Sequence, residues 1–292
     1  MAMSPARGWL YVCSERSQYS SDAGLIAIRM KNSHTHTLVE GMTNANGIAF
    51  APDGSLWIGE GETKGLIWRM AEPDRFPDNQ QVDPVSLSSS NVALAPFYPA
   101  GRFNHRGIAF SEDGRFAYLA DASAAGSLYR LKLNTHTLTV YHREKGWLKV
   151  NQDDATAMAR KLGAARFDAI QDIERLPDGT LLLAESGSGR ILQLHDDGSL
   201  PRVKPWLDNK LLSHPGDMAW DNTRQWLWIA DHAAAHSVIW AWDGHKLHAI
   251  IRHPNSRFGG VLAVDGHIYV SLQRGRNNPA MIVLLSEKRN ES

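Results

Sequence analysis

One short pattern occurs five times along this chain, and no other feature limits the fold as strongly. The first clear copy reads GIAFAPDGSLWIGEGE (Gly47 to Glu62), and a near copy, GIAFSEDGRFAYLADAS, follows at 107–123. Further copies begin at Asp172 and Asp217, and a weaker copy begins at Val261. Because each copy joins apolar runs of about five residues through a turn, the pattern predicts one kind of sheet built several times over.

Each copy has the parts of an antiparallel sheet. A run such as GIAF leads through Asp-Gly to a second run such as LWIGE, and Asp-Gly is a hairpin signal because Gly accepts positive φ. A small polar loop leads to a third run, and a more polar fourth run often follows, as in HTLTVYHRE at 136–144. Four antiparallel strands that recur about every 40–60 residues are typical of propeller blades. A single blade cannot bury both of its faces, so neighbouring copies must stack.

The sequence therefore predicts an all-β, six-bladed propeller of four-stranded antiparallel blades that forms one domain over residues 1–292. Two insertions interrupt the period, at 71–104 and at 145–168. The first is rich in Pro, Ser and Asn and follows the third strand of blade two. The second contains DDATAMARKLG, which predicts one short helix, ended by Gly163, between blades three and four. Blade one is expected to lack its first strand, and blade six its fourth.

Composition excludes several classes of partner. Lys and Arg number 31 and Asp and Glu number 31, so no basic excess suggests binding to nucleic acid or to a membrane surface. No apolar run approaches the ~18 residues that span a bilayer. A single cysteine, Cys13, excludes an intramolecular disulfide. No secretory signal is visible, so we expect a soluble protein, periplasmic if a leader was removed and cytoplasmic otherwise.

Candidate site residues follow from the repeat. In a propeller, the loop before each inner strand and the loop after each second strand converge on one face of the central channel. The positions there that differ between blades are the better candidates, because a site is asymmetric: Asn46, His105, Arg106, Gln171, Asp172, Asp217, Glu62 and His232. Four carboxylates recur at one position of the repeat and are interpreted as blade-building acceptors of main-chain N–H bonds: Glu60, Asp121, Glu185 and Asp231.

A channel mouth lined by carboxylates and amides suits a hard cation with oxygen ligands. We predict that Asn46, Asp172 and Asp217 hold a divalent cation, with Ca²⁺ as the expected ion. His105 and His232 are predicted to move protons, and Arg106 to take part in catalysis by holding an anionic substrate group. The remaining candidates, Gln171 and Glu62, are predicted to contact a small-molecule substrate or ligand in the channel.

The blades NGIAFAPDG and RGIAFSEDGRFAYLAD resemble those of the SMP-30/gluconolactonase and strictosidine-synthase-like six-bladed propellers, and the resemblance covers most of the chain. It specifies fold far better than activity. In the lactonases a divalent cation is held by a Glu, one or two Asn and an Asp at the starts of inner strands. By that resemblance Asn46 matches an Asn ligand, Asp217 lies one residue from the Asp position, and Gln171 and Arg106 replace expected ligands.

Two further segments, AGRFNHRGIAF at 100–110 and ARKLGAARFDAIQDIERLPDGTLLLAES at 159–186, resemble the PhoX-type alkaline phosphatases. That family carries GRF.HE and LGAT.FDRPEDIE segments in the same order and hydrolyses phosphomonoesters with an iron–calcium cluster. Its metal-binding Glu after His falls on Arg106 here, and the Arg and Glu of its RPE triplet fall on Ala169 and Gln171. A cation and a neutral amide thus replace two anionic ligands, which implies that the iron site is not retained.

Two functions stay open from the sequence. The first is a hydrolase of a small lactone, ester or phosphoester, assisted by Ca²⁺. The second is a non-catalytic propeller that binds a small ligand or a protein partner, which the substituted ligand positions favour. The metal content of the purified protein, measured together with turnover of lactone, aryl ester and phosphomonoester substrates, separates the two.

Overall fold

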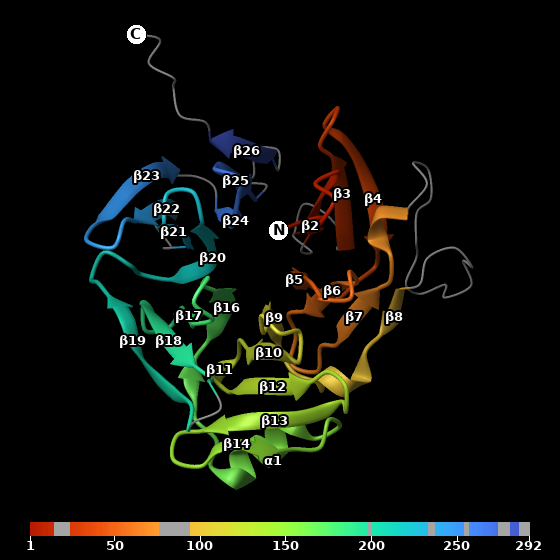
Figure 1. Cartoon of the computed structure of the whole chain (residues 1–292), viewed down its shortest axis with the longest axis vertical. Helices are drawn as coiled ribbons and strands as arrows, with labels where there is room; N and C mark the ends of the chain where they lie inside the picture. Colours follow the sequence, from red (N-terminus) through yellow and green to blue (C-terminus); the bar gives the residue numbers. More distant parts are fainter. Residues whose placement is uncertain are drawn as a thin grey trace.

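The strands of this chain form six sheets arranged around a common hub, in a computed structural model that describes residues 1–14, 24–75, 94–197, 200–232, 237–253, 257–273 and 281–285 (Figure 1). This confirms the six-bladed propeller that the repeats predict. In the described part of the chain, no helix is long and apolar enough to cross a membrane.

Blade one contains a short inner strand that the sequence pattern missed. Its order is β1 (Ala2–Met3), β2 (Trp9–Ser14), β3 (Gly24–Arg29) and β4 (His34–Glu40). β1 pairs with β2 through Ala2 opposite Tyr11 and Met3 opposite Leu10. The expectation that blade one lacks a first strand is therefore wrong, because a two-residue strand is too short to show any alternation of apolar and polar residues.

Blade two takes its fourth strand from the segment that the sequence analysis treated as an insertion. It comprises β5 (Ala45–Phe50), β6 (Leu56–Glu60), β7 (Ile67–Met70) and β8 (Leu94–Pro96). β8 lies inside 71–104, so part of that segment completes the sheet. Short 3₁₀ helices flank it at Pro73–Arg75 and Tyr98–Ala100, and residues 76–93 lie outside the described residues.

Blade three is enlarged by the second interruption. Its strands are β9 (His105–Phe110), β10 (Phe116–Asp121), β12 (Leu128–Lys132), β13 (Thr137–His142) and a fifth strand, β14 (Gly146–Lys149). The predicted helix is confirmed as α1 (Ala155–Leu162), and Gly163 ends it in the left-handed conformation at φ 69°. A small separate ladder joins β11 (Ala124–Gly126) to β15 (Phe167–Asp168).

Blades four to six complete the ring. Blade four has β16 (Ile170–Arg175), β17 (Leu181–Glu185), β18 (Arg190–His195) and β19 (Arg202–Asp208). Blade five has β20 (Pro215–Asp221), β21 (Trp226–Asp231), β22 (Ser237–Trp242) and β23 (Leu247–His253). Within the described residues, blade six has three strands, β24 (Phe258–Val264), β25 (His267–Leu272) and β26 (Met281–Leu285), as the sequence predicts.

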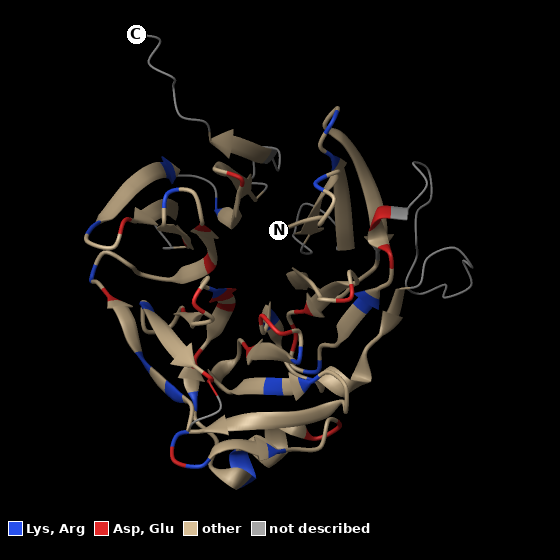
Figure 2. Ribbon diagram, viewed as in Figure 1, with Lys and Arg blue, Asp and Glu red and all other residues tan. Residues whose placement is uncertain are grey.

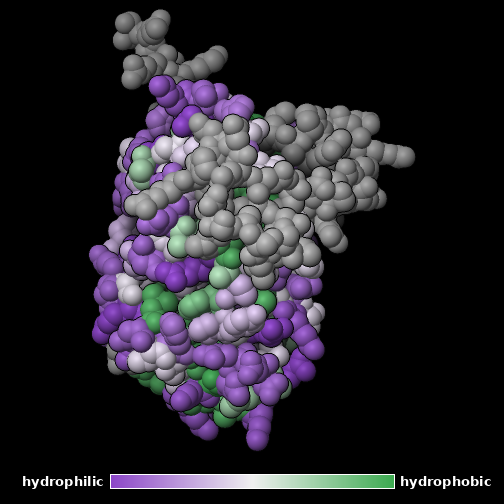
Figure 3. Space-filling view, turned by 90° about the vertical axis from the view of Figure 1, so that its right-hand side faces the viewer, coloured by the Kyte–Doolittle hydropathy of each residue, from purple (hydrophilic) through white to green (hydrophobic). Residues whose placement is uncertain are grey.

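The core lies between the blades. Along β9, Ile108 packs with Trp57 of blade two, whereas the next residue, Ala109, packs with Leu183 of blade four. Successive side chains of a strand point to opposite faces of its sheet, so each inner strand is held between its two neighbours. The large apolar side chains that remain exposed are scattered over several blades (Tyr98, Leu200, Leu211, Ile250 and Leu284). The described surface in Figure 3 is accordingly mostly hydrophilic, with small hydrophobic areas.

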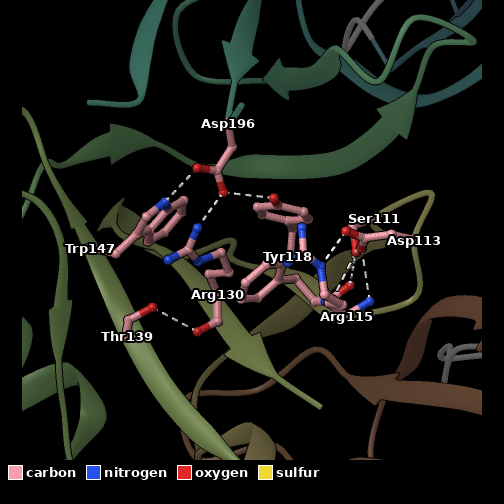
Figure 4. Close-up of polar contacts among 9 residues, drawn as sticks. Ser111, Asp113, Arg115, Tyr118, Arg130, Thr139, Trp147 and Asp196 are labelled. Atoms are coloured by element: carbon pink, nitrogen blue, oxygen red, sulfur yellow. Dashed lines mark hydrogen bonds and ion pairs between the residues drawn. The ribbon is translucent and has the colours of Figure 1, made fainter. Parts of the chain in front are cut away.

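A polar cluster also joins blades three and four; we call it the Asp196 cluster (Figure 4). The Asp196 carboxylate, whose side chain is 5% exposed, pairs with the Arg130 guanidinium at 2.6 Å. It also accepts hydrogen bonds from the Tyr118 hydroxyl at 2.7 Å and the Trp147 indole N–H at 3.1 Å. Because every donor comes from blade three and the acceptor follows β18, the cluster fixes the two blades against each other.

Candidate functional site

Five of the inner strands share an irregularity where they begin at the hub. Each of these strands has a β-bulge there, with one more residue than the paired stretch of the neighbouring strand. The residues of the bulges are candidate site positions or glycines. The bulged pairs are Asn46–Gly47, Arg106–Gly107, Gln171–Asp172, Gly216–Asp217 and Gly259–Gly260. Bulges redirect side chains at the end of a strand and are frequent beside active sites. The fold therefore places Asn46, Arg106 and Gln171 at one equivalent position around the ring, and Asp172 and Asp217 at the position that follows it.

Blades four and five bring Asp172 and Asp217 together. Their carboxyl groups are hydrogen-bonded to each other. Each also accepts a main-chain N–H from the next inner strand, Asp172 from Met218 and Asp217 from Val261, both at 2.8 Å. Burial, together with the charges of Asp217 and Glu174, raises the pKa of Asp172 well above its usual range, and burial also raises the pKa of Asp217. The two groups therefore resist ionising together and can share a proton, while the positive charge of the Met1 amino group favours the ionised form of Asp217.

Glu174 lies two residues beyond Asp172 on the same face of β16 and extends the acidic wall. Its Oε1 accepts the main-chain N–H of Trp220 at 2.8 Å. Burial raises the pKa of Glu174 to about 7, and the charge of Asp217 contributes to the increase. Figure 2 shows several acidic positions gathered around the centre of the ring, on and beside β16. None of the three carboxylates forms an ion pair with a Lys or Arg side chain among the described residues.

A group of basic side chains lies close to His232, in the loop after β21. Burial lowers the pKa of His232 to about 4; the positive charges of Arg257 and Arg106 act in the same direction, and the charge of Asp231 opposes them. A Cβ atom on Gly216 would stand 1.9 Å from the His232 Nε2 atom, so only glycine allows the ring to lie there. His232 is thus neutral at pH 7 and lies within electrostatic reach of Arg106 across the hub.

Two predicted substrate contacts lie at this end of the hub. The Arg106 Nε atom lies 3.5 Å from where a Cβ atom would stand on Gly61, the residue before exposed Glu62. Glu62 and Arg106 therefore share one rim of the mouth. Gln171 is half-buried and precedes Asp172 in the bulge of β16, while Asn46 is half-buried in the bulge of β5, in blade two.

His105 lies apart from this group. Its side chain is fully buried, its ring packs against Phe103 at a 35° tilt with 3.8 Å between the centroids, and its Nε2 atom is 3.1 Å from the Gly101 carbonyl oxygen. Burial lowers the pKa of His105 to about 3. This ring, buried in the protein interior against Phe103, contributes to the packing of blades two and three.

The recurring carboxylates have the structural role that the sequence predicts. Asp231, 1% exposed, accepts main-chain N–H bonds from Ser213 and His214 at 2.9 and 2.8 Å. The donors stand in the loop before the inner strand, so the carboxylate joins that loop to the end of β21. Main-chain N–H groups are likewise bound by Glu60, Asp121 and Glu185.

The hub offers a partial set of ligands for a divalent cation. Among the described residues, no three His, Cys, Asp or Glu side chains converge closely enough to form a metal centre by themselves. An ion would therefore bind the two carboxylates, supplemented by the Asn46 amide, main-chain oxygens or water. The raised pKa values of Asp172 and Asp217 fit such a site, because a cation would relieve the same repulsion that a shared proton relieves.

The comparisons with known proteins agree with the fold. No protein-family model and no curated protein matches this sequence. Among solved structures, the PQQ-bound aldose sugar dehydrogenase of Streptomyces coelicolor is 14% identical, covering 97% of this chain and 92% of that chain with a TM-score of 0.61. A putative gluconolactonase is 13% identical, covering 86% of this chain and 77% of that chain with a TM-score of 0.56.

A third similar structure is a catalytically inactive virginiamycin B lyase from Staphylococcus aureus with quinupristin. It is 12% identical, covering 97% of this chain and 85% of that chain with a TM-score of 0.53. These likenesses include a gluconolactonase, as the blade motifs suggest, and at such identities they establish the propeller alone. The PhoX resemblance of the two segments around Arg106 and Gln171 stays a prediction.

Sequence reasoning missed two members of this region. Glu174 stands inside the run DIERL, where the pattern marks a strand and gives no sign that alternate residues reach the next blade. Arg257 lies outside every repeated motif. The period-two alternation along β16 gives the one usable signal, because it puts Glu174 on the same face as Asp172.

Proposed function

We propose that this protein is a hydrolase of a small ester, lactone or phosphoester and that its site is the hub end of blades three to five. The observation that carries the proposal is the Asp172–Asp217 carboxyl pair, hydrogen-bonded across two blades without a Lys or Arg ion pair. Adjacent carboxyl groups whose pKa values are raised by desolvation and by a neighbouring negative charge are a common arrangement of catalytic acids. A shared proton gives the pair an acid that can protonate a leaving-group oxygen.

The basic side chains supply the complementary chemistry. Arg106 and Arg257 are suited to hold an anionic group of the substrate, since guanidinium groups bind carboxylates and phosphates in a bidentate manner. His232, neutral at pH 7, is suited to accept a proton from the attacking water. We assign no proton transfer to His105, because its ring is fully buried against Phe103. Gln171 and Glu62 remain the proposed polar contacts to the substrate at the rim.

A divalent cation, Ca²⁺ by the oxygen character of the ligands, would be held by Asp172, Asp217 and Asn46. When bound, it would polarise a carbonyl or phosphoryl oxygen. Arg106 would then bind the anionic substrate group, and His232 would accept the proton of the water. This arrangement does not need the iron–calcium cluster of the PhoX-type enzymes.

The test is turnover of chromogenic lactones, aryl esters and phosphomonoesters, with metal analysis of the same preparation. We expect measurable hydrolysis of one class and about a hundredfold loss of kcat in Asp172→Asn. Asp113→Asn, which changes an exposed carboxylate on blade three outside the hub, serves as the matched control and should keep full activity. If Ca²⁺ assists, chelation will abolish turnover in the wild-type protein.

A specific observation favours the alternative, a non-catalytic propeller. One oxygen of each hub carboxylate already binds a main-chain N–H of the next inner strand, as it would if its role were to join blades. A metal-free preparation that turns over no substrate, combined with loss of stability in Asp172→Asn, would establish that alternative.

A further inference from the structure

A second polar cavity lies on the flank of blade three, beneath α1 and separate from the hub. Its volume is about 70 Å³, and none of the hub residues lines it. The polar lining comes from Thr63 in the loop after β6, the end of β10, the strand β12, the helix and the segment after it, and consists chiefly of Asp121, Ser123, Tyr129, Thr156, Arg160 and Arg166. In Figure 1, α1 lies at the outer side of blade three, whereas the hub is at the centre of the ring.

Tyr129 leaves a buried hydroxyl without a partner in this cavity. The side chain is 0% exposed, and its hydroxyl oxygen makes no hydrogen bond with any described residue. Burial and the charge of Asp121 raise the pKa of Tyr129, while the charge of Arg160 acts in the opposite direction. Both groups line the cavity, so the hydroxyl lies between them and toward the empty volume. Buried polar groups almost always have a partner, and one that lacks it calls for a bound molecule or water.

Two arginines line the same cavity, and their guanidinium groups have no partner among the described residues. Arg160 lies in the last turn of α1, and Arg166 lies shortly after it. Both are exposed at the surface, and neither guanidinium group makes a hydrogen bond or ion pair with another residue that the structure describes. Together with the Tyr129 hydroxyl they supply several donors around one small volume, which is the arrangement that recognises an oxyanion.

Asp121 restricts which oxyanion fits. Its side chain is 5% exposed, and burial raises the pKa of its carboxyl group. Its oxygens accept hydrogen bonds from the main-chain N–H of Ser123 at 3.1 Å, from the Ser123 hydroxyl and from the main-chain N–H of Asn104, and the carboxylate lines the cavity. A carboxylate repels a fully ionised anion, but it accepts a hydrogen bond from an anion that carries a hydroxyl group.

We propose that this cavity binds a small oxyanion that also carries a hydroxyl, the chemistry of a hydrogen phosphate group. Arg160, Arg166 and the Tyr129 hydroxyl donate to its oxygens, and its own hydroxyl donates to Asp121. The group belongs either to inorganic phosphate or to a small phosphate monoester, and both fit the same donors. This site does not depend on the hydrolase proposed at the hub.

The experiment is titration of the whole protein with inorganic phosphate and, separately, with sulfate at pH 6.5 and constant ionic strength, followed by calorimetry and by thermal unfolding. Sulfate has the same shape and no proton at this pH, so we expect it to bind at least tenfold more weakly. Methyl phosphate is the third arm. Tighter binding of methyl phosphate than of phosphate identifies a monoester as the ligand, and weaker binding identifies free phosphate; both support the site.

Three variants test whether phosphate binds in this cavity. Tyr129→Phe removes an unpaired hydroxyl, so the protein without phosphate should unfold at an unchanged or higher temperature, while phosphate binds at least fivefold more weakly. Arg166→Gln should weaken phosphate binding at least tenfold. Arg143→Gln, an exposed arginine of the same blade that does not line the cavity, is the matched control and should bind phosphate as the wild type does.

Three results would overturn the proposal. Equal affinity for phosphate and sulfate would mean attraction by charge alone, without the hydroxyl contact to Asp121. Unchanged phosphate binding in both Tyr129→Phe and Arg166→Gln would place any binding elsewhere. Loss of phosphate binding in Arg106→Gln instead would assign it to the hub, a result that leaves the proposed hydrolase site standing.

Discussion

Two sets of buried carboxylates join neighbouring blades, and they differ in what neutralises them. In the Asp196 cluster the carboxylate meets the Arg130 guanidinium, the Tyr118 hydroxyl and the Trp147 indole, so its charge is fully compensated (Figure 4). At the hub, Asp172 and Asp217 bind main-chain N–H groups and each other, without a Lys or Arg ion pair among the described residues. The first set stabilises the fold, whereas the second holds acid groups in an environment that disfavours their charge.

The blades also differ from one another at the hub, in the residue that occupies the second position of each bulge. At the bulge positions of blades two and three stand Gly47 and Gly107, and a Cβ atom on Gly47 would lie 2.1 Å from the Arg106 carbonyl oxygen. At the matching positions of blades four and five stand Asp172 and Asp217. Close approach of main chains thus fixes one side of the ring, and a pair of acids occupies the other.

The largest expected effect is in the Asp196 cluster. Asp196→Ala leaves the Arg130 charge and two hydrogen-bond donors without a partner, so we expect unfolding free energy to fall by about 3–5 kcal/mol. Denaturant unfolding at pH 7 measures it. Asp113→Ala, which removes the exposed partner of Arg115 in the same blade, is the control and should change little. A similar small change for both variants would mean that the Arg130 ion pair of Asp196 does not stabilise the fold, and would remove the contrast with the hub acids.

The next effect concerns Glu174. Its pKa rises from 4.5 when unfolded to about 7 when folded, so the folded state binds more protons between these values and stability falls as pH rises through them. At about 1.4 kcal/mol per pKa unit, the free energy of unfolding falls by on the order of 3 kcal/mol between pH 4.5 and pH 8. Glu174→Gln keeps an oxygen for the Trp220 N–H and should remove this loss, as unfolding at the two pH values will show. An unaltered pH dependence in the variant would mean that Glu174 ionises freely.

A smaller effect, of opposite sign in pH, is expected at His105. Its pKa falls from 6.5 to about 3 on folding, so the unfolded state binds more protons in that range and stability is lost as pH falls below about 6.5. Between pH 7 and pH 5 the loss from this group is about 2 kcal/mol. His105→Gln keeps a donor for the Gly101 carbonyl and should flatten that part of the profile. If instead the His105→Gln protein keeps the wild-type profile and loses turnover, His105 belongs to the site after all.

Most of the fold could be predicted from the sequence, because each blade repeats the same alternation and the same Asp-Gly turn. The helix over Ala155–Leu162 was also predictable, since acidic residues precede it and Gly163 ends it. The strands β1 and β8 were not, because two or three residues show no period. Strand β14 follows a second hairpin that the other blades lack, so the repeat gives no warning of it.

The candidate site was predicted less completely. Choosing positions that differ between blades selected Asp172, Asp217 and His232, which the structure places at one end of the hub. The same choice included His105, because one position in the sequence does not tell which of two neighbouring side chains faces the channel. The direct contact between Asp172 and Asp217 depends on the spacing of two blades, and Arg257 reaches His232 through a loop that carries no motif.

The central claim is that the hub acids are kept for chemistry and not for architecture. The most direct test is the sign of the change in unfolding free energy for Asp172→Asn at pH 8, measured with denaturant. Asparagine can accept the Met218 N–H and donate to Asp217 as the protonated acid does, without the energetic penalty of protonating an acid at this pH. We predict that the variant is more stable than the wild type. A loss of stability comparable to that of Asp196→Ala would contradict the account and make the pair a structural link between blades four and five.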